Sequence, residues 1–189
     1  GGKVQLADDV WIHGVSFGGR QAMDSLLPKY PAPVAGAVNI GVLHTSLTGA
    51  KGHDPYAPCS VGDLRAHGFD YWALGHVHRR QIHSEAPWIV MPGTPQGRDI
   101  GDAGPKSATL ITIDQQIRIE EVPTSVIEFV EVELSASEAD ADDALRDLMR
   151  ARLRELSESL TSDLGIVRLV LTGDTERRWQ ILRDRDVWT

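Results

Sequence analysis

Residues 70–78 read DYWALGHVH, and this stretch indicates both the fold and a site. Its first half is a short, largely apolar run typical of a buried strand, and its end carries His76 and His78. Another apolar run, residues 37–43, ends in the same way at His44. Because rigid strand ends in open sheets gather ligands and catalytic groups, we expect these three histidines to form one site.

Two neighbouring imidazoles at a strand end are typical of a metal site. His76 and His78 project to the same side if the strand continues, and Gly75 removes a side chain that would crowd them. Together with His44 they could hold zinc and leave a fourth position for water, and this alternative needs no other residue. The remaining histidines, taken singly, are expected to be surface or hydrogen-bonded core groups: His13, His53, His67 and His83.

Short apolar runs alternate with turn-rich segments through the first 120 residues. The expected strands are 10–13, 38–44, 69–74, 88–91, 108–113 and 117–122. Two short helices are expected at 20–27 and 60–67, the second with Ser60 as its N-cap and Gly68 at its end. This alternation predicts an α/β fold layered around a central sheet.

The pattern changes after Pro123, and we therefore divide the chain into residues 1–123 and 124–189. Apolar and acidic residues then alternate as in a strand with one wet face, and a leucine-rich helical face follows. The expected elements are a strand at 126–134, a helix capped by Ser137, a strand at 166–171 and a helix at 176–183. The second part is predicted to be a small α+β lobe.

The composition suits a cytoplasmic globular protein. The chain has 189 residues, of which 41% are hydrophobic and 24% charged, enough for one domain and a small lobe. Cys59 is the only cysteine, which excludes a disulfide framework and a cysteine-based zinc cluster. No apolar stretch approaches the ~20 residues that span a bilayer, so we expect no membrane contact. The net charge of -8 argues mildly against nucleic-acid binding by bulk electrostatics, and the missing initiator methionine suggests a piece of a longer polypeptide.

Four short motifs resemble those of a known family. They are LHT at 43–45, GHVH at 75–78, PGTPQGR at 92–98 and GPK at 104–106. On these motifs, the segment 38–122 resembles the C-terminal half of the calcineurin-like metallophosphoesterase domain, and within that superfamily the SbcD-like exonucleases of DNA double-strand-break repair. The resemblance implies an incomplete layered metallophosphoesterase sheet domain in residues 1–123 and a capping lobe that holds DNA in residues 124–189.

The resemblance also implies a centre of two divalent metal ions, with manganese as the usual ion. His44 and His76 would bind one ion and His78 the other. DNA would be the substrate and an SMC-type ATPase a partner, and a homodimer is compatible with the sequence. Three arginines are candidates for phosphate or DNA contacts, the alternative being ordinary solvated groups: Arg79, Arg80 and Arg98.

The family's Asp-x-His and Gly-Asn-His-Asp motifs, which supply other ligands and a proton donor, do not occur in this sequence, and we assign none of its Gly-Asp dipeptides to the family's Gly-Asp motif. Histidine acid–base chemistry supplies about 3–5 kcal/mol, whereas nuclease-scale acceleration requires roughly 8–23 kcal/mol. We therefore assign no catalytic residue. We expect the longer protein to be a metal-dependent DNA phosphodiesterase and this chain alone to be inactive.

Two alternatives remain open at this stage. The stretch GVSFG at 14–18 matches the Gly-x-Ser-x-Gly elbow of serine hydrolases, with Ser16 as the nucleophile. This match requires a strand before Ser16 and a helix after it. The other alternative is a non-catalytic interaction module in which the histidines are structural.

Overall fold

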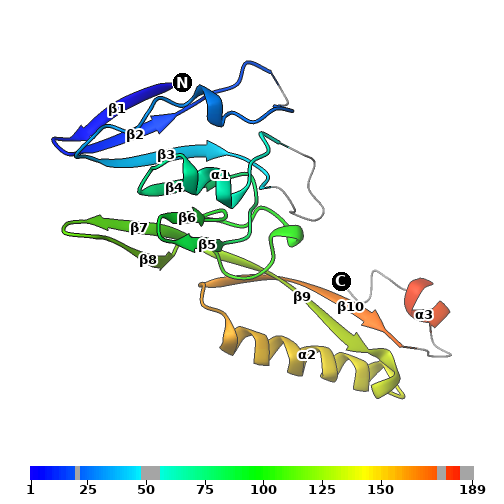
Figure 1. Cartoon of the computed structure of the whole chain (residues 1–189). Coiled ribbons are helices and arrows are strands. Elements are labelled where there is room, and N and C mark those ends of the chain that lie inside the picture. Colours follow the sequence, from blue (N-terminus) through cyan, green and yellow to red (C-terminus); the bar gives the residue numbers. More distant parts are fainter. Residues whose placement is uncertain (20–21, 48–55, 174–177, 184–189) are drawn as a thin grey trace. The chain divides into compact units, whose positions relative to one another are not determined.

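The computed structural model describes residues 1–19, 22–47, 56–173 and 178–183. It confirms the α/β class and divides into two compact units (Figure 1). The first unit comprises residues 1–95 and 107–123, and the second comprises 96–106 and 124–189. Residues 96–106, which the sequence pattern assigned to the first part, therefore lie in the second unit.

A mixed six-stranded sheet forms the framework of the first unit. Its strands are β1 (Gly2–Ala7), β2 (Val10–Gly14), β3 (Val38–His44), β4 (Tyr71–Gly75), β5 (Gln81–Glu85) and β6 (Trp88–Met91). The order is β1-β2-β3-β4-β6-β5, in which β2, β3, β4 and β6 are parallel and the two edge strands are antiparallel. The carboxyl ends of four parallel strands consequently meet at one edge of the sheet.

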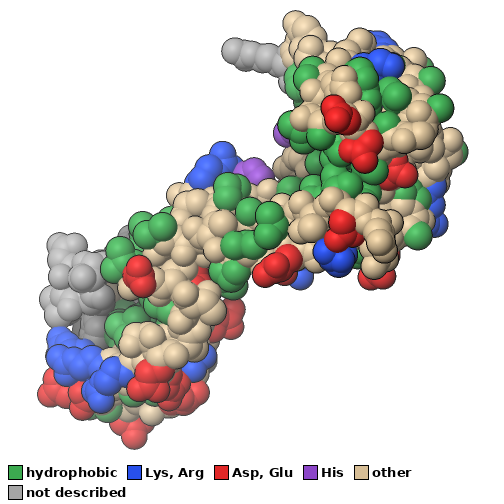
Figure 2. Space-filling view, turned by 90° about the vertical axis from the view of Figure 1, so that its left-hand side faces the viewer, with side chains coloured by type: hydrophobic (Ala, Val, Ile, Leu, Met, Phe, Trp, Pro, Cys, Tyr) green, Lys and Arg blue, Asp and Glu red, His purple; other side chains and the backbone are tan. Residues whose placement is uncertain are grey.

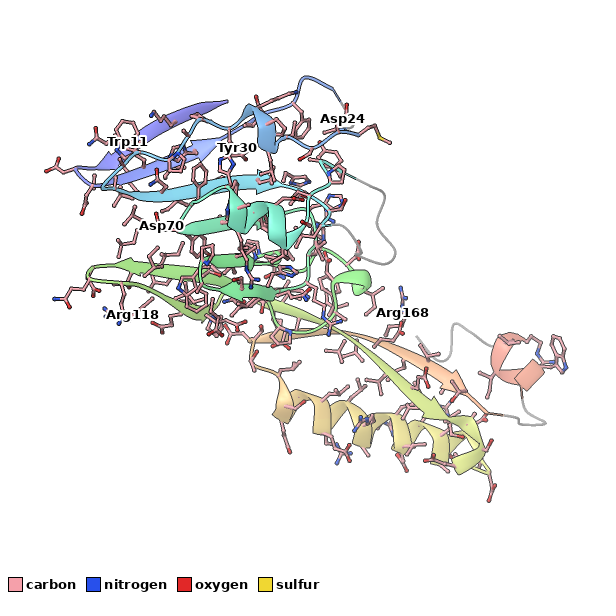
Figure 3. The ribbon with its side chains drawn as sticks, in the orientation of Figure 1. Trp11, Asp24, Tyr30, Asp70, Arg118 and Arg168 are labelled. Carbon is pink, nitrogen blue, oxygen red and sulfur yellow. The ribbon has the colours of Figure 1, made fainter. Side chains whose placement is uncertain are left out.

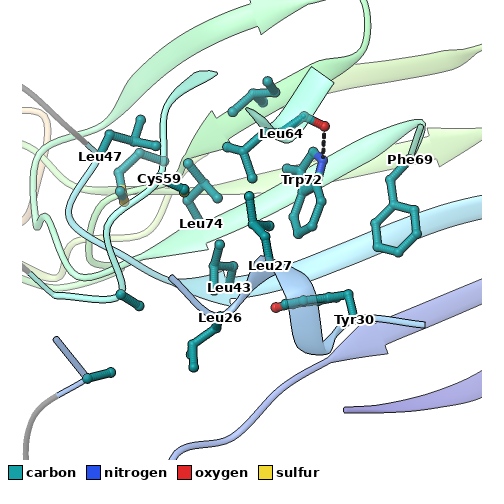
Figure 4. Packing of buried hydrophobic residues seen from close by; sticks show 14 residues of the cluster. Leu26, Leu27, Tyr30, Leu43, Leu47, Cys59, Leu64, Phe69, Trp72 and Leu74 are labelled. Atoms are coloured by element: carbon teal, nitrogen blue, oxygen red, sulfur yellow. Dashed lines mark hydrogen bonds between the residues drawn. The ribbon is translucent and has the colours of Figure 1, made fainter. Parts of the chain in front are cut away.

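The central strands of this sheet are buried on both faces, which explains their nearly continuous apolar runs. In β4, Trp72 and Leu74 point to one face and Tyr71 to the other. The first face is covered by helix α1 (Val61–Ala66) and the short 3₁₀ helix η1 (Leu27–Lys29). Figure 4 shows this packing, in which the indole Nε1 of Trp72 donates to the carbonyl oxygen of Leu64 at 3.0 Å.

The other face is covered by a hairpin of β7 (Ser107–Ile113) and β8 (Ile117–Pro123). Its apolar side chains pack against the buried residues Ile40, Tyr71 and Val90. The strands expected at 108–113 and 117–122 are thus present, and they pair antiparallel. At the start of β4, Asp70 accepts a hydrogen bond from the backbone nitrogen of Asn39 at 2.8 Å, which aligns β4 with β3 (Figure 3).

The local signals around α1 were predicted correctly. Ser60 accepts a hydrogen bond from the Asp63 backbone nitrogen, and the Asp63 carboxylate accepts one from the Ser60 backbone, so the two form a capping box. Beyond the helix, Gly68 has a φ of +83°, the left-handed conformation expected of a glycine after a helix end. The helix expected at 20–27 is wrong: residues 20 and 21 lie outside the described part, and residues 22–26 are not helical.

The second unit is built on a parallel pair, β9 (Ile127–Ser135) and β10 (Leu164–Thr172), with helix α2 (Asp142–Ser159) between them in sequence. Figure 1 shows α2 alongside this pair, and Leu145 of α2 is fully buried. Three short elements complete the described part of the unit: η2 (Ile100–Asp102), η3 (Ala136–Glu138) and α3 (Arg178–Arg183). Among the described residues, no helix is long and apolar enough to cross a membrane.

The helix expected to begin at Ser137 begins later. Ser137 lies in η3, and the extended backbone of Ala139 and Ala141 separates η3 from α2. In α2, arginines pair with acids three residues away, at 3.0 Å for Arg146 and Asp143. Figure 2 shows acidic and basic side chains interspersed on this unit, and three ion pairs along α2 place both charges on this helix.

Candidate functional site

The histidines at the ends of β3 and β4 lie side by side at the carboxyl edge of the sheet. His44 pairs in register with Gly75, and His76 follows directly. The Nδ1 atom of His76 lies 3.2 Å from Nε2 of His44. The two rings are nearly perpendicular, with centroids 5.1 Å apart and an interplanar angle of 80°. The structure thus brings two of the three candidate ligands together.

The separation of these nitrogen atoms fits two roles. If the contact is a hydrogen bond, one of the two nitrogens carries a proton and donates it, and the other nitrogen accepts it. Two imidazole nitrogens on one tetrahedral ion, each about 2.0–2.1 Å from the metal, would themselves lie about 3.3 Å apart. The separation of the two nitrogens therefore equals that expected for a shared cation as well as that of a hydrogen bond.

Among the residues that the structure describes, the protein side chains alone form no larger metal cluster. Within the described ranges, no group of three or more His, Cys, Asp or Glu side chains is arranged to hold a metal ion. The role of His78 as a ligand of a second ion therefore stays a prediction, as does the identity of the ion.

Local backbone features make room for the pair. A Cβ added to Gly75 would lie 3.2 Å from Nδ1 of His44, so the absence of a side chain at Gly75 leaves space for that ring. His76 itself has a φ of +115°, a conformation that L side chains rarely adopt. Strain of this kind persists where the surrounding structure imposes it, and it clusters at functional sites.

Tyr56 contacts both rings, and sequence reasoning missed it. Its ring stacks on His76, with centroids 5.4 Å apart and an angle of 15°, and meets His44 nearly perpendicularly at 5.1 Å. The ring of Phe17 also meets the Tyr56 ring nearly perpendicularly, with centroids 5.1 Å apart. Tyr56 lies between β3 and α1, and no motif or periodicity marks it.

The loop after β6 supports the backbone of His78. Gly93 has a φ of +81°, and a Cβ there would lie 2.7 Å from the carbonyl oxygen of His78 and 2.9 Å from the nitrogen of Arg80. The backbone nitrogen of Thr94 donates to the same His78 oxygen at 3.2 Å. The Gly-Thr part of the 92–98 motif therefore packs against the turn that carries His78.

The three candidate arginines have different surroundings. Arg80 is mostly buried, forms an ion pair with Glu121 at 3.2 Å and donates to Thr109. Its guanidinium joins the turn after β4 to the β7–β8 hairpin, which is a structural role, and the expectation that it follows a DNA backbone gains no support. Arg79 is exposed. Arg98 lies in the second unit, 3.5 Å from the carboxylate of Asp102, and its phosphate role stays a prediction.

The serine-hydrolase alternative lacks its structural context. Ser16 follows β2, but residues 15–19 form irregular backbone and residues 22–26 are not helical. A nucleophile elbow requires a sharp strand-to-helix turn at the serine. Within the described residues around Ser16, that turn is not formed.

Two comparisons with known proteins point to the same class of protein, the metallophosphoesterases. Residues 129–189 match the family model described as the middle domain of the metallophosphoesterase YhaO. The chain is also 41% identical over 103 residues to the uncharacterized metallophosphoesterase YhaO of Bacillus subtilis (strain 168). That alignment covers 54% of this chain and spans 25% of the relative. Neither match names the SbcD-like branch; both show that this chain is similar to metallophosphoesterases.

Proposed function

We propose that this chain carries part of the metal centre of a metal-dependent phosphoesterase that hydrolyses DNA phosphodiester bonds. The observation that carries the proposal is the 3.2 Å approach of His76 Nδ1 to His44 Nε2 at the carboxyl edge of the parallel strands. Ligand sites of open α/β sheets form at this edge. The similarity to YhaO supports a phosphoesterase, and the motifs around residues 43–45, 75–78 and 92–98 support the DNA substrate.

His44 and His76 would hold one divalent ion, and His78 would contribute to a second. When bound, such ions supply Lewis-acid activation of a phosphoryl oxygen and lower the pKa of a coordinated water. Manganese is the ion that we propose. Imidazole is a borderline ligand that suits several transition metals, so the donor atoms in this chain fit that choice without requiring it.

The protein groups around the pair have supporting tasks. Gly75 leaves space for the His44 ring, and Gly93 lets the following loop approach the His78 backbone. Arg79, exposed beside the histidines in sequence, is the arginine that we propose for contact with the DNA backbone. Its contribution would be electrostatic and therefore salt-dependent. The proposed SMC-type ATPase partner has no assigned contact among the described residues.

Metal titration and turnover test this function together. Calorimetric titration of the purified chain with Mn²⁺ should show binding that His44→Ala abolishes. His83→Ala is the matched control, because His83 lies within β5 and not at the carboxyl edge, and it should bind like the unmodified chain. A phosphodiester reporter should show no robust turnover with this chain alone. Absence of Mn²⁺ binding, or equal binding by His44→Ala, would contradict the proposed metal centre.

The DNA substrate needs a separate test. Fluorescence anisotropy with duplex DNA in Mn²⁺ buffer should show binding that weakens as salt rises. Arg79→Ala should weaken it further, whereas Arg118→Ala, an exposed arginine paired with Asp114 at the β7–β8 turn, should not. Equal affinity of both variants would argue against DNA contact through Arg79.

A further inference from the structure

We propose that Tyr56 is a positioning residue that fixes the relative orientation of the His44 and His76 rings, so that both nitrogens can face one cation. This inference rests on the proposed metal function. In this proposal Tyr56 contacts the two imidazole rings and touches neither substrate nor metal.

The ring geometry supports this role directly. Tyr56 lies almost flat on His76, at an angle of 15°, and almost perpendicular to His44, at 79°. The two imidazoles are themselves 80° apart. A single aromatic ring that stacks on one imidazole and meets the other edge-on therefore defines the angle between them. Both contacts have centroid distances within the 4.5–7 Å range of favourable aromatic pairs.

Tyr56 is itself tied to the end of β3. The backbone nitrogen of Ser46 donates to the Tyr56 carbonyl oxygen at 2.8 Å, and the Tyr56 nitrogen donates to the Ser46 hydroxyl at 2.7 Å. Thr45 donates to the next carbonyl oxygen, that of Ala57, at 2.8 Å. Ser46 and Thr45 are buried and follow His44 directly in sequence. The Tyr56 ring is therefore positioned by the same backbone that ends in His44.

The strained backbone of His76 explains why its ring needs the contact with Tyr56. β4 ends at Gly75, and His76 has the strained φ of +115°. A strained residue needs neighbours that hold it in place. Stacking with Tyr56 is a contact made by the His76 ring across a sequence separation of twenty residues, and it opposes rotation of that ring away from His44.

The contacts use the ring of Tyr56, which phenylalanine also has. Tyr56→Phe should therefore bind Mn²⁺ within about twofold of the unmodified chain. Tyr56→Leu should bind roughly tenfold more weakly, because loss of groups that orient metal ligands typically reduces affinity about 10–100-fold. Tyr56→Met provides a second variant if Tyr56→Leu does not fold, and a thermal melt identifies that case.

A second readout does not depend on metal. Long-range ¹H–¹⁵N spectra of the metal-free chain report the tautomers and ring environments of His44 and His76. Tyr56→Leu or Tyr56→Met should shift both sets of imidazole signals, and Tyr56→Phe should shift them little. The signals of His83 serve as the internal control.

The two readouts separate the possible failures. If the unmodified chain does not bind Mn²⁺, the proposed function fails, whereas the imidazole spectra still test the orienting role. If the unmodified chain binds and Tyr56→Leu or Tyr56→Met binds equally well, the positioning role is overturned and the metal centre stands. Unchanged imidazole signals in Tyr56→Leu or Tyr56→Met would also overturn the positioning role of Tyr56.

Discussion

Gly93 lies directly against the carbonyl oxygen of His78, and a Cβ added to Gly93 would come within 2.7 Å of that oxygen. The substitution Gly93→Ala should therefore destabilise the chain by about 2–5 kcal/mol, from the left-handed φ together with the backbone clash. Gly36→Ala is the matched control, since Gly36 has a similar φ of +75° but an added Cβ would meet no atom within 4 Å. Urea unfolding should show the larger loss for Gly93→Ala. Equal losses of unfolding free energy in the two variants would mean that Gly93 does not pack tightly against the carbonyl oxygen of His78.

The strain at His76 has a measurable consequence. His76→Gly and His76→Ala both remove the ring, and they differ only in whether a Cβ is present at a φ of +115°. The glycine variant should be more stable than the alanine variant by about 1–2 kcal/mol. At His78, which is not among the described non-glycine residues with positive φ, glycine should be less stable by about 0.5–1 kcal/mol. If the glycine variant were less stable than the alanine variant at both positions, strain at His76 would be contradicted.

Glu128 holds the connection between α2 and β10. Its buried carboxylate accepts hydrogen bonds from the nitrogen and hydroxyl of Thr161, at 2.8 and 2.7 Å, and from the nitrogen of Ser162, at 2.7 Å. Glu128→Ala leaves these donors without their acceptor and should destabilise the chain by at least about 2 kcal/mol. Glu133→Ala, an exposed glutamate on the same strand, should change the free energy of unfolding much less.

The same carboxylate should contribute to acid sensitivity. Burial alone would raise the pKa of Glu128, but the hydrogen bonds from Thr161 and Ser162 outweigh it and lower the pKa below the ordinary 4.5. The contribution of Glu128 to stability is therefore present above pH 4.5 and is lost as pH falls through the lower, folded-state pKa. Unfolding measured between pH 6 and pH 3 should depend less on pH in Glu128→Gln, and an unchanged pH dependence would refute this role.

His67 should make the fold sensitive to a milder acidification. Burial lowers its pKa below 6.5, the nearby His13 lowers it further, and a hydrogen bond to Pro31 partly compensates. The unfolded chain then binds the proton more readily, so stability is highest above pH 6.5 and declines as pH falls through the folded-state pKa. His67→Phe keeps a ring beside Phe69 and Trp72. It should reduce the loss of stability between pH 7.5 and 5.5, measured by urea unfolding; the same loss would exclude His67 as a cause.

The central strands could be predicted from sequence because they are buried on both faces. Their apolar runs ended at His44 and beside His76, and parallel pairing then brought those ends to one edge. The edge strands β1 and β5 were missed, since β1 is exposed throughout and β5 is largely polar. The helix expected at 20–27 failed because tertiary contacts override local preference there: the carbonyl oxygen of Ala22 accepts a bond from Ala57.

The site was only partly predictable for a related reason. A histidine at a strand end has a position set by the sheet, so residue pattern alone places His44 near the following strand. Tyr56 lies outside the strands and helices, and its hydrogen bonds to Ser46 depend on the path of the chain rather than on a local pattern. The structural role of Arg80 could not be predicted either. Its partner Glu121 lies on the β7–β8 hairpin, and no local sequence pattern shows where that hairpin packs.

A double-mutant cycle of Mn²⁺ affinity tests most directly whether His44 and His76 share one cation. If both nitrogens bind the same ion, His44→Ala and His76→Ala should each weaken binding by at least about tenfold, and the double variant should bind hardly more weakly than either single variant. Losses that simply add, or single variants that bind like the unmodified chain, would show that the two imidazoles do not form a common metal site.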